Sequence, residues 1–238
     1  AAVLVRVDNV LAALEALARA ARHRSQAHII AITGSVGKTG TKASLAAALM
    51  KSGSVHAAER SFNNHIGVPL TLARLPADAE FGVFELGMNH AGEIKALVDM
   101  VRPHCAIITT IAAAHIENFD SMVDLAAAKA EILTGIEKGG TAILPFDNDY
   151  FDLLAATAKT HQVNMLSFSV EGRADADSHI ERAKLHEACS CVTANICAQA
   201  VTSKIGAPGI HQVANRLAVL TAVHLAGADL ALAALSLA

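Results

Sequence analysis

One segment constrains the fold of this chain more than any other, Thr33-Gly34-Ser35-Val36-Gly37-Lys38-Thr39. It follows an apolar run, His28–Ile32, that predicts a buried strand, and it precedes an Ala- and Leu-rich stretch, Lys42–Lys51, that predicts a helix. In the order strand, glycine loop, Lys-Thr and helix, backbone N–H groups and a helix N-terminus can surround phosphate oxygens. The segment therefore predicts a nucleotide-binding loop in an α/β fold.

Each part of this loop has an expected role in holding a nucleoside triphosphate. The backbone of Gly34, Ser35, Val36 and Gly37 would surround the phosphates. Lys38 would reach the β- and γ-phosphates, and the Thr39 hydroxyl would ligate Mg²⁺. The spacing departs from the common Gly-x4-Gly-Lys-Thr pattern, because Ile32 stands where the first glycine is expected. An ordinary glycine turn is the alternative, but the flanking strand and helix favour nucleotide binding.

Apolar runs alternate with helix-like stretches along most of the chain. The expected strands are His28–Thr33, Phe81–Leu86, Cys105–Thr110, Thr141–Pro145 and Val163–Phe168. The expected helices are Lys42–Lys51, Gly92–Val101, Met122–Ile136 and Tyr150–Thr160. This alternation predicts a P-loop-type, mainly parallel sheet with helices on both faces. Ligands of such sheets bind at the carboxyl ends of the strands.

The two ends of the chain depart from this alternation. An amphipathic helix is expected over Asp8–Arg24, with Asp8 as its N-cap. Near the other end, short polar-alternating segments without intervening helices predict a small antiparallel addition, over Ser178–Leu185, Ala188–Asn195 and Ile196–Lys204. Two Ala- and Leu-rich helices follow from His211 onward, the second capped by Asp229. No internal repeat or linker is visible, so residues 1–238 are expected to form one domain.

Composition narrows the classes of function. The formal net charge is -3 and aromatic residues make up only 3% of the chain, which argues against a nucleic-acid partner. The apolar segment Leu217–Ala238 is interrupted by His224, Gly227 and Asp229, so it predicts two short helices and no membrane insertion. The four cysteines lack the paired spacing of a zinc site and are expected to be reduced thiols of a cytoplasmic protein: Cys105, Cys189, Cys191 and Cys197.

Three chemically capable side chains fall around the expected strand ends. Glu85 ends one strand, His115 follows the next, and Lys129 lies in the helix after that. Each has a plain alternative: a helix cap for Glu85, a loop histidine for His115, and for Lys129 a snorkelling side chain or a pair with Glu131 or Glu117. Their shared placement around one candidate phosphate site favours a functional role.

Several ordered motifs resemble the ATP-dependent Mur ligases of peptidoglycan synthesis, and among them the type that adds D-alanyl-D-alanine. The segments that carry the resemblance are Gly34–Thr39, Phe62–Leu72, Glu85–Ile94, Ala114–Glu117, Ala128–Ile132 and His211–Asn215. The match spans most of the chain. The phosphate loop of this family also lacks the first glycine of the common pattern, which accounts for Ile32.

The resemblance implies a cofactor set of ATP and two Mg²⁺ ions. Lys38 and Thr39 would serve the phosphates and the first Mg²⁺, with Glu85 completing the shell of that metal. His115 would ligate the second Mg²⁺ together with Lys129, which this family carbamylates. Carbamylation turns an ammonium that a metal would repel into a carboxylate-like ligand. Lys38, His115 and Lys129 would thus be the catalytic residues.

The same resemblance implies the substrates and their contacts. Asn63 and Asn64 would lie near UDP-N-acetylmuramoyl-tripeptide, and Gln212 and Asn215 would contact the adenine. The γ-phosphoryl group of ATP would pass to the tripeptide carboxylate, and the amino group of D-alanyl-D-alanine would attack the acyl-phosphate. Family members are longer and carry flanking domains that bind the UDP moiety and the amino substrate. This chain is therefore expected to be the central ATP-binding domain alone, monomeric and not competent for ligation by itself.

The chain departs from the family pattern at three positions, and two other classes of protein are alternatives. Gln212 stands where Asn is frequent, Pro145 replaces an Asn that often ends the strand, and Gly40 weakens the first turn of its helix. A sister Mur ligase or a folylpolyglutamate synthase-like ligase is one alternative. A non-catalytic P-loop module that binds nucleotide as a switch or scaffold is the other.

Overall fold

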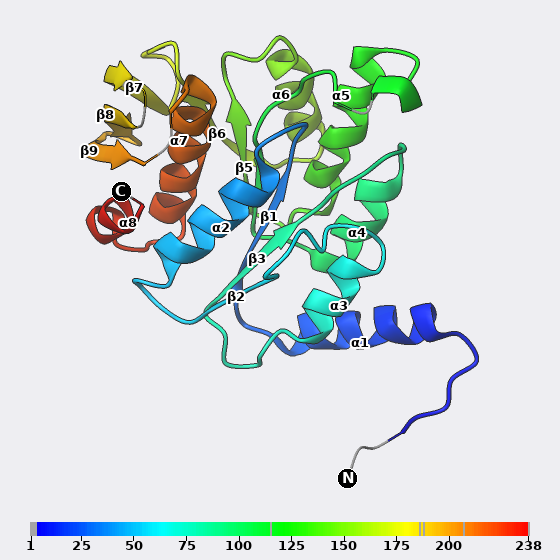
Figure 1. Ribbon diagram of the computed structural model, residues 1–238. Coiled ribbons are helices and arrows are strands. Elements are labelled where there is room, and N and C mark those ends of the chain that lie inside the picture. Colours follow the sequence, from blue (N-terminus) through cyan, green and yellow to red (C-terminus); the bar gives the residue numbers. More distant parts are fainter. Residues whose placement is uncertain (1–3, 115, 186, 188, 207, 238) are drawn as a thin grey trace.

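The computed structural model describes residues 4–114, 116–185, 187, 189–206 and 208–237. The described residues form one nine-stranded sheet in the order β2-β3-β1-β4-β5-β6-β7-β8-β9 (Figure 1). In chain order the strands are β1 (His28–Thr33), β2 (Val55–Ala57), β3 (Phe81–Glu85), β4 (Cys105–Ile108), β5 (Thr141–Pro145), β6 (Asn164–Ser169), β7 (Ser178–Leu185), β8 (Ser190–Ile196) and β9 (Gln199–Ile205). Strands β1 to β7 pair in parallel, which confirms the expected fold class.

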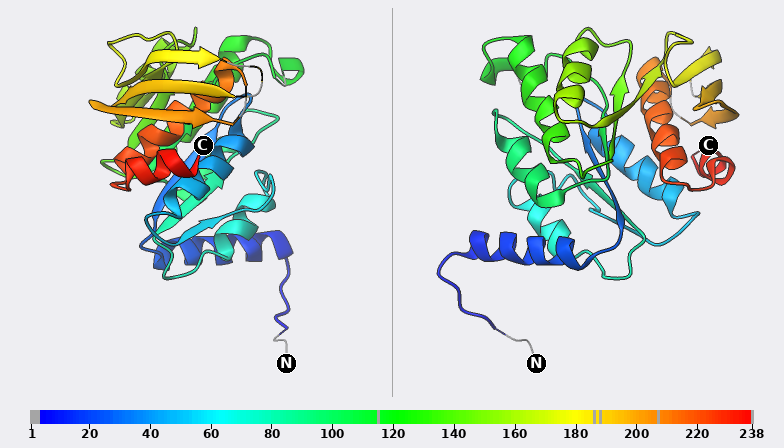
Figure 2. Two further views of the ribbon diagram at one scale, coloured as in Figure 1. Left: turned by 60° about the vertical axis from the view of Figure 1, so that its left-hand side comes forward. Right: turned by 180° about the vertical axis from the view of Figure 1, so that it is seen from behind.

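Helices cover both faces of the parallel part (Figure 2). They are α1 (Val10–Arg24), α2 (Lys38–Leu49), α3 (Gly67–Ala73), α4 (Glu93–Val101), α5 (Met122–Ala130), α6 (Phe151–Thr160), α7 (Ile210–Leu225) and α8 (Leu230–Ser236), with 3₁₀ turns η1 (Ile116–Asn118) and η2 (Glu131–Gly135). Strand β1 shows how two cores arise from one strand: Ile29 and Ala31 join the core under α1 and α3 to α6, and Ile30 and Ile32 join the core under α2, α7 and α8. Successive side chains of a strand point to opposite faces, so a strand covered on both sides is apolar throughout.

The antiparallel addition continues the main sheet. Strand β7 pairs in parallel with β6 over two residues, and β8 and β9 then pair antiparallel. The hairpin between β8 and β9 turns at Cys197 and Ala198, which have φ of 47° and 70°. A two-residue turn with two positive φ values matches the twist of the flanking strands. Neither residue is glycine or asparagine, so no turn residue marks this hairpin, and Ile196 ends β8 where it is expected to begin the next strand.

Several expected boundaries were wrong, each for a local reason. Helix α2 begins at Lys38 and not at Lys42, because the phosphate loop leads directly into its first turn. The N-cap of α1 is Asn9 in place of Asp8, and its Oδ1 accepts a hydrogen bond from the Ala12 backbone N–H at 3.0 Å. The expected helix Met122–Ile136 changes to a 3₁₀ turn after Ala130. The Asp229 cap of α8 is confirmed.

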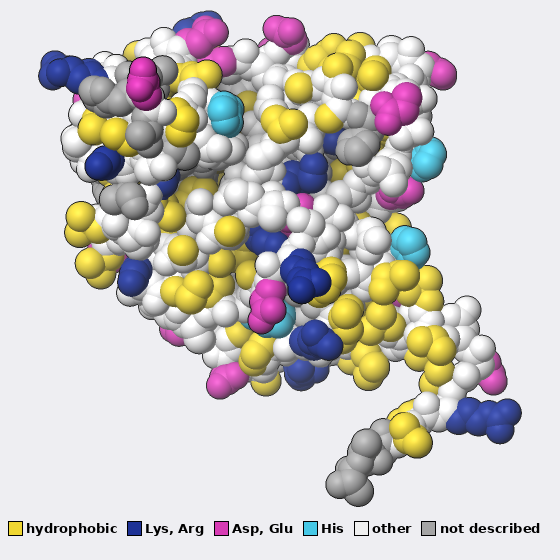
Figure 3. Space-filling view, viewed as in Figure 1, with side chains coloured by type: hydrophobic (Ala, Val, Ile, Leu, Met, Phe, Trp, Pro, Cys, Tyr) yellow, Lys and Arg dark blue, Asp and Glu magenta, His cyan; other side chains and the backbone are white. Residues whose placement is uncertain are grey.

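The lower edge of the molecule, as drawn in Figure 3, carries exposed hydrophobic side chains over α1, α3 and the segment before α1. Leu4, Val10 and Leu17 are 94%, 76% and 62% exposed. Of the helices in the described part of the chain, none combines the length and apolar character that crossing a membrane requires. All four cysteines are free thiols.

Candidate functional site

The loop between β1 and α2 lies at the carboxyl end of the parallel strands and packs closely against its neighbours. Gly34 and Gly37 have φ of 143° and 87°. A Cβ at Gly34 would lie 2.0 Å from Thr109 Oγ1, and one at Gly37 would lie 2.7 Å from Asn215 Nδ2. Glycine is therefore required at both positions for conformation and for space. The close approach ties the loop to β4 on one side and to α7 on the other.

Two hydroxyl groups fix the backbone of this loop. Ser35 Oγ donates to the Ala112 carbonyl at 2.7 Å and accepts from the Ala112 N–H at 2.9 Å. Thr109 Oγ1 donates to the Val36 carbonyl at 2.6 Å. The Thr109 bond occupies a carbonyl oxygen of the loop, and the first N–H groups of α2, which have no acceptor within the helix, can meet an anion.

Lys38 folds back over the loop that it follows. Its Nζ donates to the Gly34 carbonyl at 2.7 Å and to the Ser35 carbonyl at 3.3 Å. Burial lowers the pKa of Lys38, and the nearby Glu85 carboxylate partly offsets this. The ammonium thus sits over an anion cradle, held by two carbonyls that a phosphate could replace.

Glu85 ends β3 beside the first turn of α2 and is only 3% exposed. Its Oε1 accepts hydrogen bonds from Asn63 Nδ2 at 2.8 Å and from Thr39 Oγ1 at 3.1 Å. Its Oε2 is buried, has no hydrogen-bond partner among the described residues, and lies 3.7 Å from Lys42 Nζ. The structure thus brings together Lys38, Thr39 and Glu85, which are far apart in the sequence.

The oxygen donors at this point fit Mg²⁺. Thr39 provides a hydroxyl and Glu85 a carboxylate, and hard oxygen ligands are those that Mg²⁺ prefers, usually with several waters and substrate phosphates completing its shell. Glu85 Oε1 lies 3.1 Å from Thr39 Oγ1 and is the carboxylate oxygen that such an ion would meet. Within the described residues, no group of three or more His, Cys, Asp or Glu side chains gathers as a metal site.

Lys129 lies in α5 with only 2% of its surface exposed. Burial, first, and the Lys38 ammonium together lower its pKa to about 8. The alternatives of snorkelling and of pairing with Glu131 are wrong: the side chain is buried, and Glu131 instead accepts from the N–H groups of Gly92 and Lys95 at the start of α4. Lys129 forms no ion pair or hydrogen bond with the described residues. A buried cation that faces another cation is costly unless it is chemically altered or paired.

His115, expected to ligate a second metal, lies outside the described residues.

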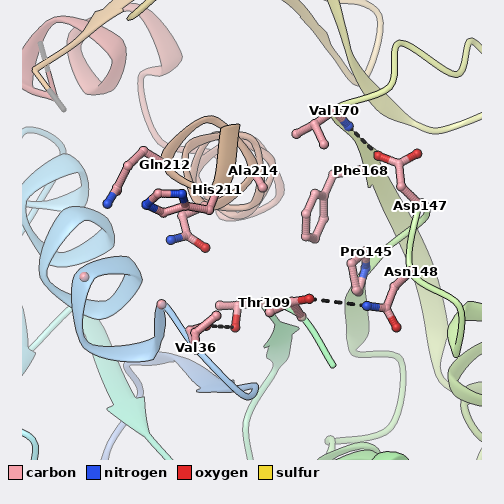
Figure 4. A pocket seen from close by; sticks show the side chains of 14 residues that line it. Val36, Thr109, Pro145, Asp147, Asn148, Phe168, Val170, His211, Gln212 and Ala214 are labelled. Atoms are coloured by element: carbon pink, nitrogen blue, oxygen red, sulfur yellow. Dashed lines mark hydrogen bonds between the residues drawn. The ribbon is translucent and has the colours of Figure 1, made fainter. Parts of the chain in front are cut away.

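The largest feature of the site is a pocket of about 430 Å³ between the loop, the ends of β4 to β6, and α7 (Figure 4). Gln212 and Asn215, expected at the adenine, line it from α7. Phe168 enters from β6, and Val36 and Gly37 line it from the loop. A pocket with apolar walls and a few amides beside a phosphate loop suits a nucleoside.

Sequence reasoning missed part of this pocket, namely Asp147, Asn148, Phe168, Val170 and His211. Asn148 Nδ2 donates to the Ile111 carbonyl at 3.0 Å, which joins the segment after β5 to that after β4. Asp147 accepts from Ser169 Oγ and from the Val170 N–H, both at 2.6 Å, and so orders the chain after β6. Placement of Asp147 and Asn148 just after a predicted strand was the signal that could have found them.

A second, smaller pocket of about 240 Å³ lies on the other side of Lys38. It is lined by Lys38, Asn63, Asn64, Gly87, Met88, Asn89 and Glu93. Asn64 Oδ1 accepts from the Gly67 N–H at 2.9 Å at the start of α3, and Asn63 is engaged with Glu85. The phosphate loop therefore borders both pockets, with Val36 and Gly37 lining the nucleoside-sized one and Lys38 lining the polar one, where a group that receives a phosphoryl from the nucleotide would enter.

Fold and site together define a P-loop α/β protein, with a phosphate cradle, an adjoining carboxylate and pockets on both sides of its lysine. Comparison with known proteins specifies the class further. The family model described as the Mur ligase middle domain matches residues 32–223, and the chain belongs to that family.

Individual relatives agree with this assignment. The chain is 39% identical over 174 residues to a UDP-N-acetylmuramoyl-tripeptide–D-alanyl-D-alanine ligase of Rickettsia prowazekii, covering 73% of this chain and 39% of the relative. It is 34% identical over 224 residues to the ligase of the same name from Synechocystis, covering 94% and 46%. A crystal structure of MurF from Acinetobacter baumannii superposes with a TM-score of 0.91 at 28% identity, covering 98% of this chain and 50% of that one. The chain thus spans half or less of the length of these relatives.

Proposed function

We propose that this chain is the central ATP-binding domain of a ligase that joins D-alanyl-D-alanine to UDP-N-acetylmuramoyl-tripeptide. The observation that carries the proposal is the convergence of Lys38, Thr39 and Glu85 at the start of α2, beside a loop that borders both pockets. The identities of 39% and 34% to ligases of that name supply the substrate class. The contacts within the site support the roles proposed for individual residues.

The larger pocket would take the nucleoside of ATP. Gln212 and Asn215 on α7 would hydrogen-bond the base, and Phe168 provides an apolar wall. The backbone of Gly34 to Gly37 would hold the phosphates, because left-handed glycines and a helix N-terminus present N–H groups to them. Lys38 would exchange its bonds to the loop carbonyls for bonds to the β- and γ-phosphates.

The smaller pocket would take the carboxylate that receives the phosphoryl group. Lys38 lines this pocket, so its ammonium is placed to stabilise charge on the transferring group. Asn63 and Asn64 would border the tripeptide substrate from the same pocket. Thr39 and Glu85 would hold Mg²⁺, which when bound neutralises phosphate charge. The amine of D-alanyl-D-alanine would then displace phosphate from the acyl-phosphate and form the amide.

Lys129 and His115 would hold a second Mg²⁺, with Lys129 as its carbamate. The deep burial of Lys129 and its lowered pKa support the modification, since CO₂ reacts with a neutral amine and the product replaces a repulsion with an attraction toward a cation. In the full-length ligase, Lys129→Ala should lose ligation, and short-chain carboxylates should partly restore it. Full activity of Lys129→Ala without any additive would exclude the role.

Titration of Mg-ATP into the chain by calorimetry tests the nucleotide site. Lys38→Ala should weaken binding by about 100-fold, because it removes charge-assisted hydrogen bonds to phosphate. Lys51→Ala, at an exposed lysine after α2, is the matched control and should bind as the parent does. Unchanged affinity in Lys38→Ala would show that the segment is an ordinary glycine turn. Binding without any ligation by the full-length protein would favour a non-catalytic nucleotide-binding module.

A further inference from the structure

Glu85, the proposed metal ligand, belongs to a buried ion pair. The other member of the pair, Lys42, has no role in the proposed function. Lys42, one turn after Lys38 on α2, is 2% exposed. Its Nζ lies 3.7 Å from Glu85 Oε2 and donates to the Arg60 carbonyl at 2.7 Å. One ammonium thus contacts both the carboxylate and the backbone of the segment that precedes α3.

That segment, residues 60–64, meets the site at two further points. Ser61 Oγ is 2.9 Å from Thr39 Oγ1, and Asn63 Nδ2 donates to Glu85 Oε1. The two oxygens of Glu85 are therefore used differently: Oε1 faces Thr39 and Asn63, and Oε2 faces Lys42. Lys42 thus approaches one oxygen of the carboxylate, while the Thr39 hydroxyl and the Asn63 amide bond the other.

A purely stabilising role explains this arrangement poorly. Taking two charges out of water costs about as much as their attraction returns, so a buried pair adds little stability compared with apolar residues of similar volume. Orientation of a ligand is the better-supported use, because groups that hold a metal ligand in place set the affinity of the metal site.

We infer that Lys42 is a positioning residue for the Mg²⁺-nucleotide site: it fixes the Glu85 carboxylate and docks residues 60–64 against the phosphate loop. This inference rests on the proposed function, since it assumes that Glu85 serves a metal. It assigns Lys42 no contact with ATP, and it predicts that Lys42 affects the magnesium-dependent part of nucleotide binding alone.

Calorimetric titration of ATP with Mg²⁺ and with a chelator separates these parts. In the parent chain Mg²⁺ should tighten ATP binding. In Lys42→Met that tightening should fall by about tenfold or more, while metal-free ATP binding stays within about twofold. Lys42→Arg, which keeps a charge and several donors, should restore most of the effect. Lys51→Met is the control for loss of one lysine and should match the parent.

The sign of the effect separates positioning from simple electrostatics. Removing a positive charge near a cation site would by Coulomb's law tighten Mg²⁺ binding. Weaker magnesium dependence in Lys42→Met therefore supports positioning, and an unchanged or stronger dependence overturns it. Lys42→Gln, which keeps a donor without the charge, serves the same comparison if Lys42→Met does not fold.

Limited trypsin digestion of the nucleotide-free chain gives a second readout. Arg60 is exposed, and cleavage after it requires residues 60–64 to loosen. Cleavage there should accelerate in Lys42→Met and return toward the parent rate in Lys42→Arg, with cleavage after exposed Arg173 as the internal reference. If the parent binds no ATP, the proposed function fails, yet this digestion still decides whether Lys42 docks the segment. Unchanged cleavage after Arg60 in Lys42→Met overturns the inference.

Discussion

Each end of the parallel sheet has a buried cation, but the two cations differ in their partners. At the amino end, Arg22 is 5% exposed, and its guanidinium donates to the Val101 and Arg102 carbonyls at 2.8 and 2.7 Å, with Glu137 at 3.6 Å. At the carboxyl end, Lys129 is 2% exposed, and burial together with the like charge of Lys38 lowers its pKa. One end satisfies its cation, which stabilises the fold. Among the described residues, the other end gives its cation no hydrogen-bond or ion-pair partner, as expected where phosphate, metal or chemical modification completes the set.

The phosphate loop should show the largest effect of a single methyl group. Gly34→Ala should destabilise the chain by about 4 kcal/mol, because it combines backbone strain at positive φ with overpacking against Thr109. Gly40→Ala, in the same region but with open space around it, should instead stabilise α2 by up to about 1 kcal/mol. Urea unfolding of both variants measures the contrast, and equal stabilities would show that the loop is not held against β4.

At the amino end, Arg22→Met should lower the free energy of unfolding by about 3 kcal/mol. The change leaves the Val101 and Arg102 carbonyls at the end of α4 without their donor. Arg19→Met, an exposed position on α1, is the control and should change stability by less than about 0.5 kcal/mol. A loss no greater than the control's would mean that the amino end is not where the cation is satisfied.

At the carboxyl end, the same kind of substitution should have the opposite sign. Lys129→Met should raise the stability of the unmodified chain at pH 7 by about 2 kcal/mol, because it removes a buried ammonium whose pKa is lowered to about 8. Mass spectrometry should first show whether Lys129 is modified. Lys159→Met, exposed on α6, is the control.

This gain should depend on pH in a defined direction. The folded-state pKa of Lys129 lies below its ordinary value of 10.5, so the penalty is full below about pH 8 and disappears as the pH rises toward 10.5. Unfolding curves at pH 7 and pH 10 should therefore show a smaller gain at the higher pH. Destabilisation by Lys129→Met at pH 7 would break the comparison between the two ends.

The smallest effect is expected at two stacked histidines of the amino end. The rings of His28 and His104 lie 5.1 Å apart, and His104 Nδ1 accepts from the Ile29 N–H at 2.9 Å. Burial, first, and neighbouring positive charges lower the pKa of both histidines. The unfolded chain therefore takes up protons first as the pH falls below 6.5, so stability is full above that pH and is lost below it.

His28→Phe keeps an aromatic ring in the stack and removes one of these groups. The melting temperature of the parent should fall between pH 7 and pH 5, and the fall should be smaller in His28→Phe. His23→Phe, at an exposed histidine of α1, should leave the slope unchanged. Identical slopes in the parent and in His28→Phe would show that the histidine pair does not titrate on unfolding.

The contrast between the two ends was only half visible in the sequence. The glycine loop, Glu85 and Lys129 attract notice because their residue types fall at strand ends or on an apolar helix face. Nothing in the sequence marks Arg22 as buried, because its hydrogen bonds to the end of α4 join residues that are 79 and 80 positions apart in the chain. Likewise β2 and α3 were missed: β2 has three residues, and α3 has seven and includes Pro69, so both are shorter than the stretch over which a hydrophobic period can be recognised.

By itself the sequence determined what depends on local pattern and composition. Strand β1, the phosphate loop, the parallel α/β class and the Asp229 cap follow from neighbouring residues, because hydrophobic period, glycine conformation and capping act within a few positions. Only the tertiary structure decided which polar side chains meet. Lys42 reaches Glu85 from another element, Phe168 and Asn215 close one pocket from separate segments, and Lys129 faces Lys38. These pairings depend on strand order and on helix packing across the sheet, which sequence spacing does not encode.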